Sequence, residues 1–296
     1  MFSGLLRALA VCLGLMQASP SFAADGPATA RRVVSLNPSL SQILLELDAR
    51  EVLVGVDALS KRLRPELAEL PSVGGLFDPS LEAVVALEPD LVVLVPSVEQ
   101  RDFRGRLDAL GVRTVGFRNI QFEEVLGNIA NLGALVGRTP DAARRIAAIR
   151  ATRAAVEGAV ATRERVRCVV VLQRDPVFLA GGESFLDEML TSAGCDNLAR
   201  ELGEGYPRAA LEWLVGTAPD AILDMSLDAA GDGAIDYWER WPTLPAVANR
   251  RVLRLDAELV TMPGPALDRA LRSLARALQG EAIDAAIDAK LAEAAK

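Results

Sequence analysis

Two glutamates, Glu82 and Glu212, occupy equivalent places in a pattern that the chain contains twice. Each follows a leucine, and a Pro-Asp pair comes seven residues later, before an apolar run typical of a buried strand. The two copies lie 130 residues apart. A carboxylate early in a helix can favour the helix dipole, pair with a basic partner, or take part in acid–base catalysis. The repeat therefore predicts two equivalent units with one glutamate each.

Catalysis by these carboxylates is disfavoured. A pair that cleaves glycosides must lie within ~10 Å, which equivalent positions on separate halves should not. The chain has no histidine, so the commonest general base and the commonest metal ligand are both missing. No nucleophile–base pair is recognisable. We therefore expect no enzyme, no catalytic residue, no metal site and no cofactor.

The elements that carry the glutamates alternate between strand and helix, which predicts an α/β fold with parallel sheets. The chain length favours two domains. Residues 24–139 are expected to form an N-terminal lobe and residues 166–296 a C-terminal lobe. Between them, residues 140–165 are rich in alanine and arginine and contain no strand signal. A helix of that length measures ~38 Å and would act as a rigid linker, although an ordinary surface helix is the alternative.

The first 23 residues have the layout of a secretory signal peptide. Arg7 precedes an apolar run, and Ser21-Phe22-Ala23 places small residues at the first and third positions. We predict cleavage after Ala23 and an exported, periplasmic protein. A lipoprotein anchored through Cys12 is disfavoured, because a bulky valine precedes that cysteine and the apolar run continues beyond it.

Charge and cysteine content narrow the possible partners. Loss of Arg7 takes the formal charge from −8 to −9, so nucleic acid is an unsuitable partner. Cys168 lies in an apolar strand and Cys195 in a turn. An oxidising compartment permits a disulfide between them, but two buried thiols explain them equally well.

Several motifs together resemble the periplasmic substrate-binding proteins of metal-chelate ABC importers, which serve cobalamin, haem and ferric siderophores. The motifs are Val33 to Ser39, Val73-Gly74-Gly75, the two Leu-Glu blocks, the helical linker, Trp241-Pro242 and Pro263-Gly264-Pro265. The likeness covers nearly all of residues 30–280 and is strongest to the cobalamin-binding branch. It implies two Rossmann-like lobes joined by one long α-helix, with a ligand cleft between the lobes and little closure.

The resemblance also implies partners. It predicts a monomer that captures a small-molecule metal chelate of the cobalamin type, with a ferric siderophore or haem as the alternative. An enzyme or structural module on the same fold is the alternative of another class. In this family one glutamate on each lobe docks onto arginines of the permease dimer, and by position these are Glu82 and Glu212. Stabilisation of the helix dipole alone remains the simpler explanation.

The cleft should be lined by loops at the carboxyl ends of the strands. The candidate ligand-binding residues of the N-terminal lobe are Asn37, Pro38, Ser39, Leu76, Phe77, Ser97 and Arg118. Those of the C-terminal lobe are Gln173, Arg174, Phe178, Tyr206, Met225, Tyr237, Trp238 and Glu258. Asp57, Asn119, Ser226 and Leu259 lie beside them.

Some of these residues point to particular ligands. By the resemblance, Tyr206 takes the place of a tryptophan that packs on the corrin ring, whereas Leu76 replaces another such tryptophan beside Phe77. Arg118 and Arg174 could pair with carboxylates of a siderophore, although surface arginines are common. Tyr206 or Tyr237 could ligate haem iron. Tyr237, Trp238 and Trp241 could equally form one packed cluster, and Trp213 is expected in the core.

Overall fold

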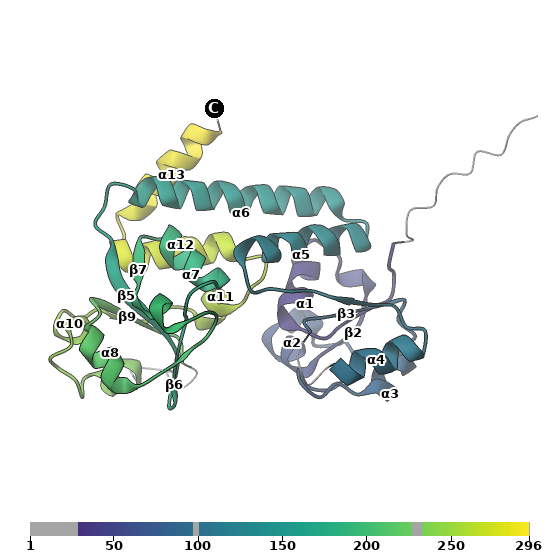
Figure 1. Cartoon of the computed structure of the whole chain (residues 1–296). Helices are drawn as coiled ribbons and strands as arrows, with labels where there is room; N and C mark the ends of the chain where they lie inside the picture. The colour runs from purple at the N-terminus through teal and green to yellow at the C-terminus, as the bar shows by residue number, and fades with distance from the viewer. Residues whose placement is uncertain (1–28, 97–100, 227–232, 296) are drawn as a thin grey trace, which may run out of the picture.

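The computed structural model describes residues 29–96, 101–226 and 233–295. Two α/β lobes lie side by side, and the long helix α6 (Thr139–Val160) runs across the same side of both (Figure 1). The predicted fold class is thereby confirmed. The predicted signal peptide and Ser97 lie outside the described residues. Within the described ranges, no helix is both long and apolar enough to cross a bilayer.

The first lobe is built on a sheet of four parallel strands in the order β2-β1-β3-β4. The strands are β1 (Val33–Ser35), β2 (Leu53–Val56), β3 (Leu91–Leu94) and β4 (Thr114–Gly116). β1 and β3 are buried on both faces because helices cover each side. These helices are α1 (Pro38–Glu46), α2 (Ala58–Leu63), α3 (Leu81–Ala86), α4 (Arg101–Ala109) and α5 (Phe122–Leu135), with short 3₁₀ turns at Arg50–Val52 and Pro65–Leu67.

The second sheet differs from the prediction because it is mixed. Its central strands β5 (Val166–Arg174) and β9 (Ala221–Asp224) are parallel, as are β7 (Cys195–Asn197) and β10 (Val252–Leu253) to their neighbours. β6 (Val177–Leu179) and β8 (Arg208–Ala209) are antiparallel. The chain reverses at Asp175-Pro176, so Gln173 and Arg174 belong to β5 and not to an exit loop as predicted.

The remaining helices surround this sheet. They are α7 (Phe185–Ser192), α8 (Leu211–Thr217), α9 (Gly233–Trp238), α10 (Pro245–Ala248), α11 (Ala257–Thr261), α12 (Leu267–Gln279) and α13 (Ile283–Ala294), with a 3₁₀ turn at Leu198–Leu202. α6 ends at Val160, five residues before the predicted end, because Ala161 to Arg165 form the turn into β5. It packs against α5 on one lobe and against α12 and α13 on the other.

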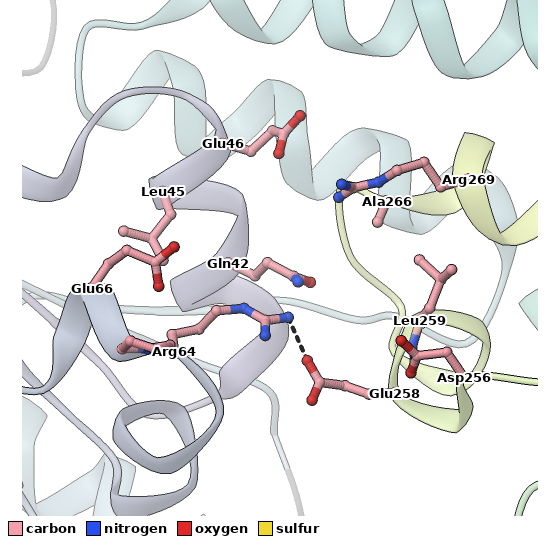
Figure 2. A pocket seen from close by; sticks show the side chains of 11 residues that line it. Gln42, Leu45, Glu46, Arg64, Glu66, Asp256, Glu258, Leu259, Ala266 and Arg269 are labelled. Atoms are coloured by element: carbon pink, nitrogen blue, oxygen red, sulfur yellow. Dashed lines mark hydrogen bonds and ion pairs between the residues drawn. The ribbon is translucent and has the colours of Figure 1, made fainter.

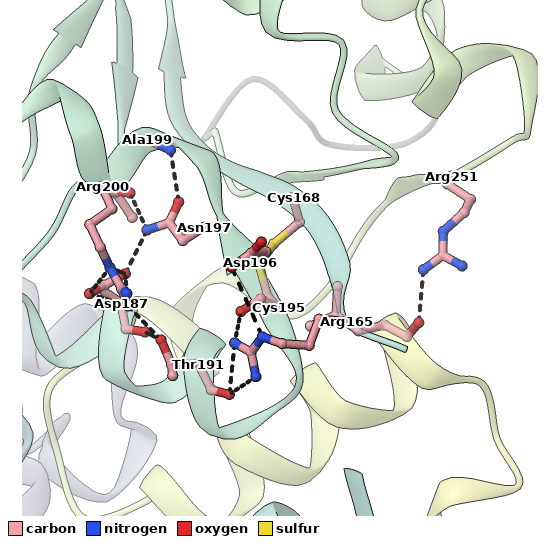
Figure 3. The surroundings of a disulfide bond; sticks show 12 residues. Arg165, Cys168, Asp187, Thr191, Cys195, Asp196, Asn197, Ala199, Arg200 and Arg251 are labelled. Atoms are coloured by element: carbon pink, nitrogen blue, oxygen red, sulfur yellow. Dashed lines mark hydrogen bonds and ion pairs between the residues drawn. A yellow bond between two sulfur atoms is a disulfide. The ribbon is translucent and has the colours of Figure 1, made fainter. Parts of the chain in front are cut away.

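Cys168 of β5 and Cys195 of β7 form a disulfide, which settles the alternative that the sequence left open (Figure 3). Their Cα atoms are 6.0 Å apart, and both residues are fully buried. The bond joins two neighbouring parallel strands whose register pairs Val166 with Cys195. In the C-terminal lobe the central strand β5 is therefore covalently linked to its neighbour β7.

Candidate functional site

The two Leu-Glu units form equivalent structures, as predicted. In each, a short helix (α3 or α8) leads through a Pro-Asp pair into a buried central strand (β3 or β9). Glu82 and Glu212 both lie in the first turn of their helix and are solvent-exposed. α3 and α8 lie at the same edge of the molecule, one on each lobe and on the side opposite α6 (Figure 1). The two carboxylates are therefore available to one external partner.

The loop before each of these helices exposes one aromatic side chain. Phe77 precedes α3 and keeps 64% of its surface exposed, and Tyr206 precedes β8 and α8 and keeps 49%. Exposed aromatic rings are scarce in a chain with only 4% aromatic residues. Such rings offer flat apolar surface to a ligand. Desolvation raises the pKa of Tyr206 above the ordinary value of 10.0, so this phenol is neutral at pH 7.

The first lobe carries a buried chain of hydroxyl groups at the ends of β1 and β2. Ser41 Oγ lies 2.8 Å from Ser35 Oγ and 3.0 Å from Ser60 Oγ. Ser60 Oγ in turn donates to the carboxylate of Asp57, which also caps α2 through the N–H groups of Leu59 and Ser60. Burial raises the pKa of Asp57, although these hydrogen bonds oppose the shift.

The predicted residues beside this chain are mostly internal. Asn37 is half-buried and caps α1 by accepting from Ser39 N at 3.0 Å and from Ser39 Oγ at 2.7 Å. Pro38 and Ser39 are buried. Arg118 is 72% exposed and pairs with Glu124 at 3.1 Å. Of this group, Asn37 and Arg118 present surface to solvent, whereas Pro38 and Ser39 shape the loop from within.

On the second lobe, Asp224 organises a buried network at the ends of β5 and β9. It accepts hydrogen bonds from Arg174 Nε at 2.9 Å, Trp238 Nε1 at 2.7 Å and Ser226 Oγ at 2.7 Å. Arg174 also donates to the carbonyl of Gly233 at 3.1 Å. Trp238 is fully buried and Arg174 is 9% exposed, so these two predicted ligand residues instead anchor α9 to the sheet.

The aromatic residues near α9 form the packed cluster that the sequence left open. Tyr237 lies 4.9 Å from Trp238 and 5.5 Å from Trp241, measured between ring centroids. The guanidinium groups of Arg174 and Arg240 lie 4.9 Å and 4.1 Å from the Tyr237 ring centre. Cations on its ring face hold Tyr237 in this cluster. Met225 is 4% exposed and belongs to the core, and Phe178 is half-buried in β6.

A pocket of about 530 Å³ lies where the two lobes meet, and Figure 2 shows its lining. Glu258 of α11 reaches across it to Arg64 of the first lobe, with an N–O distance of 2.5 Å. Glu258 was predicted, whereas Arg64, Gln42 and Arg269 were not. Their side chains point into the pocket from the two lobes (Figure 2). Nothing in the local sequence around them indicates a binding site, so they are recognised only in the folded chain.

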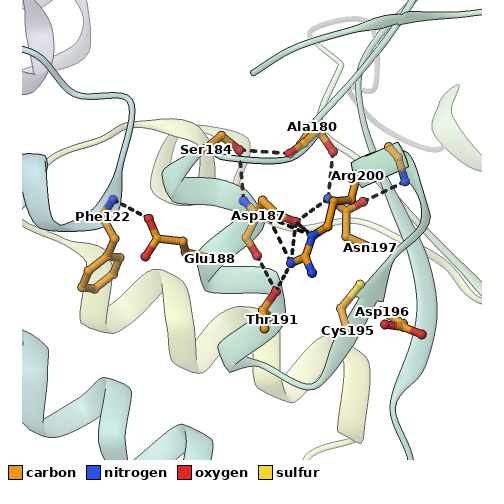
Figure 4. A network of polar contacts seen from close by, with 12 residues as sticks. Phe122, Ala180, Ser184, Asp187, Glu188, Thr191, Cys195, Asp196, Asn197 and Arg200 are labelled. Atoms are coloured by element: carbon orange, nitrogen blue, oxygen red, sulfur yellow. Dashed lines mark hydrogen bonds and ion pairs between the residues drawn. The ribbon is translucent and has the colours of Figure 1, made fainter. Parts of the chain in front are cut away.

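The lobes are fastened together behind this pocket. Arg145 of α6 is 14% exposed and pairs with Glu46 of α1 at 3.1 Å and with Asp268 of α12. Glu188 of α7 accepts from the backbone N–H of Phe122 in α5 at 2.9 Å (Figure 4). One hydrophobic core runs through α1, α5, α6, α7 and α12. Large separation of the lobes would break this core, so the inter-lobe geometry is stiff.

The arrangement suits binding better than catalysis. Among the described residues, no group of three or more His, Cys, Asp or Glu side chains is placed to hold a metal ion. The accessible groups in the described ranges include two exposed aromatic rings, a polar inter-lobe pocket and the carboxylates of Glu82 and Glu212. Apolar surface with a few polar anchors is typical of ligand sites in binding proteins.

Known proteins resemble this chain in sequence. A family model described as periplasmic binding protein matches residues 33–259. A cobalamin-binding protein of Halobacterium salinarum is 29% identical over 262 residues, which cover 85% of this chain and 70% of that protein. A vitamin B12-binding protein of Vibrio campbellii is 24% identical over 88% of this chain and 92% of its own. These relatives are binding proteins rather than enzymes.

A solved structure extends the likeness to the fold. The apo form of a periplasmic haem-binding protein from Roseiflexus sp. RS-1 has a TM-score of 0.73 and 25% identity. The alignment covers 87% of this chain and 99% of that chain. The structural relative is thus named for haem, whereas the sequence relatives are named for cobalamin and vitamin B12.

Proposed function

The chain belongs to the periplasmic binding protein family, and from that premise we propose that it captures a corrinoid of the cobalamin type between its lobes and delivers it to an ABC importer. The predicted signal peptide and the family support export to the periplasm. We propose that the chain is a monomer that catalyses no reaction, needs no cofactor of its own and does not bind nucleic acid. We also propose that the N-terminal lobe ends at residue 139 and that the C-terminal lobe begins at residue 166.

The observation that carries the corrinoid proposal is the pair of exposed aromatic residues, Phe77 and Tyr206. They stand one position out of register in the corresponding loops of the two lobes, 64% and 49% exposed. A large flat ligand gains affinity by covering such rings, and a stiff pair of lobes supplies a preformed gap. The cobalamin-binding relatives support the same class of ligand.

Haem is the second candidate, because Tyr206 is an accessible phenol and a haem-binding protein shares the fold. Iron ligation through tyrosine uses the phenolate, so haem binding through Tyr206 would release the proton of its hydroxyl. A carboxylate siderophore is less well supported, since Arg174 already pairs with Asp224 at 2.9 Å. Of the two predicted arginines, Arg118 alone is largely exposed.

The partner proposed for the outer edge is the permease dimer of the importer. Glu82 and Glu212 are exposed on equivalent helices, which suits two-point contact with a two-fold symmetric membrane protein. Charge pairs of this kind fix register and accelerate encounter more than they add affinity. The acidic net charge of −8 favours basic docking sites.

Isothermal titration of the mature chain, beginning at Ala24, tests the ligand. The titrants are cyanocobalamin, cobinamide, haemin and a ferric catecholate. We expect saturable binding of at least one corrinoid at a stoichiometry of about one, and weaker or absent binding of the other two. Tight binding of haemin with no heat from either corrinoid would overturn the corrinoid proposal and leave the family assignment intact.

A further inference from the structure

Two arginines that the sequence did not single out, Arg32 and Arg167, occupy equivalent places at the first strand of each lobe. Arg32 immediately precedes Val33, which pairs with Leu91 at the start of β3. Arg167 immediately precedes Cys168, which pairs with Ala221 at the start of β9. Leu91 and Ala221 are themselves equivalent positions of the repeat. The two arginines therefore belong to the duplicated unit although they lie far from it in sequence.

Arg32 holds the carboxyl end of α3 through two hydrogen bonds. Its Nη2 donates to the carbonyl of Leu87 at 2.6 Å, and its Nε donates to the carbonyl of Glu88 at 2.9 Å. The backbone carbonyl of Arg32 accepts from the N–H of Asp90 at 2.9 Å. The side chain and the main chain of Arg32 thus fasten the end of α3 to the amino end of β1, an interior strand of the sheet.

Arg167 repeats this arrangement at α8. Its Nη2 donates to the carbonyl of Thr217 at 2.8 Å, and its Nη1 donates to the carbonyl of Ala218 at 3.2 Å. Its backbone carbonyl accepts from the N–H of Asp220 at 2.9 Å. Thr217 and Ala218 correspond to Leu87 and Glu88 in the repeat. The same two carbonyls are held in both lobes.

The backbone at these carbonyls explains why they need a donor. The last carbonyls of a helix have no partner within it, and a cation there complements the helix dipole. Glu88 and Ala218 turn the chain out of the helix with φ of 45° and 50°, a region that residues other than glycine rarely adopt. α3 has six residues and α8 has seven, so neither helix is stable by itself.

We propose that Arg32 and Arg167 are positioning residues for docking, and this inference rests on the proposed contact of Glu82 and Glu212 with the permease. Each arginine fixes its helix to the sheet, and the stiff junction between the lobes fixes the two sheets relative to each other. Together they hold the two carboxylates at one separation and orientation. A two-point contact depends on that geometry, because the second contact is lost when the spacing is wrong.

The two helices differ at their amino ends, which predicts unequal effects. Ser80 caps α3 by accepting from the N–H of Ala83 at 3.2 Å, and its hydroxyl also donates to Glu82 Oε2 at 3.3 Å. The corresponding Ala210 of α8 has no side-chain cap. α8 therefore depends more on its carboxyl-end clamp, so loss of Arg167 should disturb docking more than loss of Arg32.

The experiment is a double-mutant cycle on permease affinity. The probe is the metal-chelate importer of the source organism, permease dimer with its ATPases, reconstituted in lipid nanodiscs. Arg167→Met is measured in the wild-type chain and in the Glu212→Gln background, with Arg32→Met and Glu82→Gln as the matching set. Arg167→Lys tests rescue by a cation with a single donor group. Arg113→Met, which removes an exposed arginine just before β4, is the charge-matched control.

We expect Arg167→Met to weaken permease binding about tenfold in the wild-type chain and to have little effect once Glu212 is neutralised. Arg32→Met should do the same more weakly, and Arg167→Lys should restore part of the affinity. Arg113→Met should leave the affinity unchanged or slightly higher, because removing a cation makes the protein more attractive to a basic partner. Ligand affinity should stay constant throughout.

Two results overturn the inference in distinguishable ways. If Glu212→Gln and Glu82→Gln leave permease affinity unchanged, the docking proposal fails. The positioning role then fails as well, because it depends on docking through these glutamates. If those variants weaken binding but Arg167→Met has no effect, or the same effect in both backgrounds, docking stands and the positioning role fails. A general loss of stability would give the same effect in both backgrounds, so the cycle separates it from positioning.

Discussion

The two copies of the repeated unit are alike at one end and different at the other. At the carboxyl ends of α3 and α8, an arginine, a residue with positive φ and a Pro-Asp pair recur, and the arginine donates to the two corresponding carbonyls. At the amino ends, one helix has a serine cap and the other has none. The loops before them expose a phenylalanine on one lobe and a tyrosine on the other.

The difference separates two kinds of partner. A two-fold symmetric permease presents the same surface twice, so the features that contact it should recur on both lobes. A metal chelate is asymmetric, so the residues that contact it should differ between the lobes. The shared features of each unit are the Leu-Glu pair in the first turn and the clamped carboxyl end of the helix, whereas the divergent features are the cap and the preceding loop. We therefore propose that the shared features serve docking and that the divergent features decide the choice of ligand.

The largest expected difference between the lobes concerns stability, because the disulfide cross-links only the C-terminal lobe. Replacing Cys168 and Cys195 by serine should lower the free energy of unfolding of that lobe by about 3 to 4 kcal/mol, as expected for a loop of this length. Hydrogen exchange should show that the double substitution increases the exchange rates in β5 and β7 more than those in β1 and β3. Equal acceleration in both lobes would mean that the lobes unfold as one unit.

The buried acidic networks offer a second contrast. Asp224→Asn would leave the Arg174 guanidinium buried without its counter-charge, at a cost of about 3 kcal/mol. Asp57 lies among hydroxyl groups instead, so Asp57→Asn should cost about 1 kcal/mol. Chemical denaturation of both variants measures the two values. Equal costs would contradict the assignment of a charged network to one lobe and a hydroxyl network to the other.

Exposed aromatic residues provide a smaller effect on binding. Tyr206→Ala should weaken corrinoid affinity by about 1 kcal/mol, roughly fivefold, through loss of ring contact, and Phe77→Ala should have a similar effect. Tyr206→Phe is the matched control, because it keeps the ring and removes the hydroxyl. Titration calorimetry measures all three. If Tyr206→Phe lost as much affinity as Tyr206→Ala, the hydroxyl would be the contact, which favours haem over a corrinoid.

Asp57 should make the stability of the first lobe depend on pH. Burial raises the folded-state pKa of Asp57 above its ordinary 3.8. The protonated carboxyl is then favoured by folding, so this stability is complete below pH 3.8 and is lost as pH rises through the raised pKa. Asp57→Asn should flatten that part of the stability profile, measured by denaturation at several pH values. An unchanged profile would show that Asp57 is not the responsible group.

Much of the fold could be predicted from local patterns. The strand–helix alternation, the linker helix and the repeated units are encoded in runs of apolar residues and in Pro-Asp pairs. The antiparallel β6 and β8 were missed because a hairpin at Asp175-Pro176 looks in sequence like the loop that ends a strand. The length of this loop alone does not distinguish a hairpin from a connection that leaves the sheet.

The site was predicted less completely, because its chemistry depends on contacts between distant segments. Arg174 and Trp238 were predicted to line the cleft, with a packed aromatic cluster as the alternative for Trp238; hydrogen bonds to Asp224 hold both side chains within the lobe. Arg64 pairs with Glu258 across the lobes, and Arg32 and Arg167 donate to carbonyls 55 and 50 residues ahead of them. No periodicity marks such residues. Glu82 and Glu212 were found because they occupy one offset of the repeat, whereas Phe77 and Tyr206 were found as loop residues and through the family resemblance.

The central claim is that shared features serve the importer and divergent features serve the ligand. The direct test measures both affinities, for cyanocobalamin and for the reconstituted importer, on Glu82→Lys/Glu212→Lys and on Tyr206→Ala. We predict that the charge reversals abolish importer binding and leave the corrinoid affinity unchanged, while Tyr206→Ala does the opposite. A loss of corrinoid affinity in the charge-reversed chain comparable to its loss of importer affinity would contradict the account.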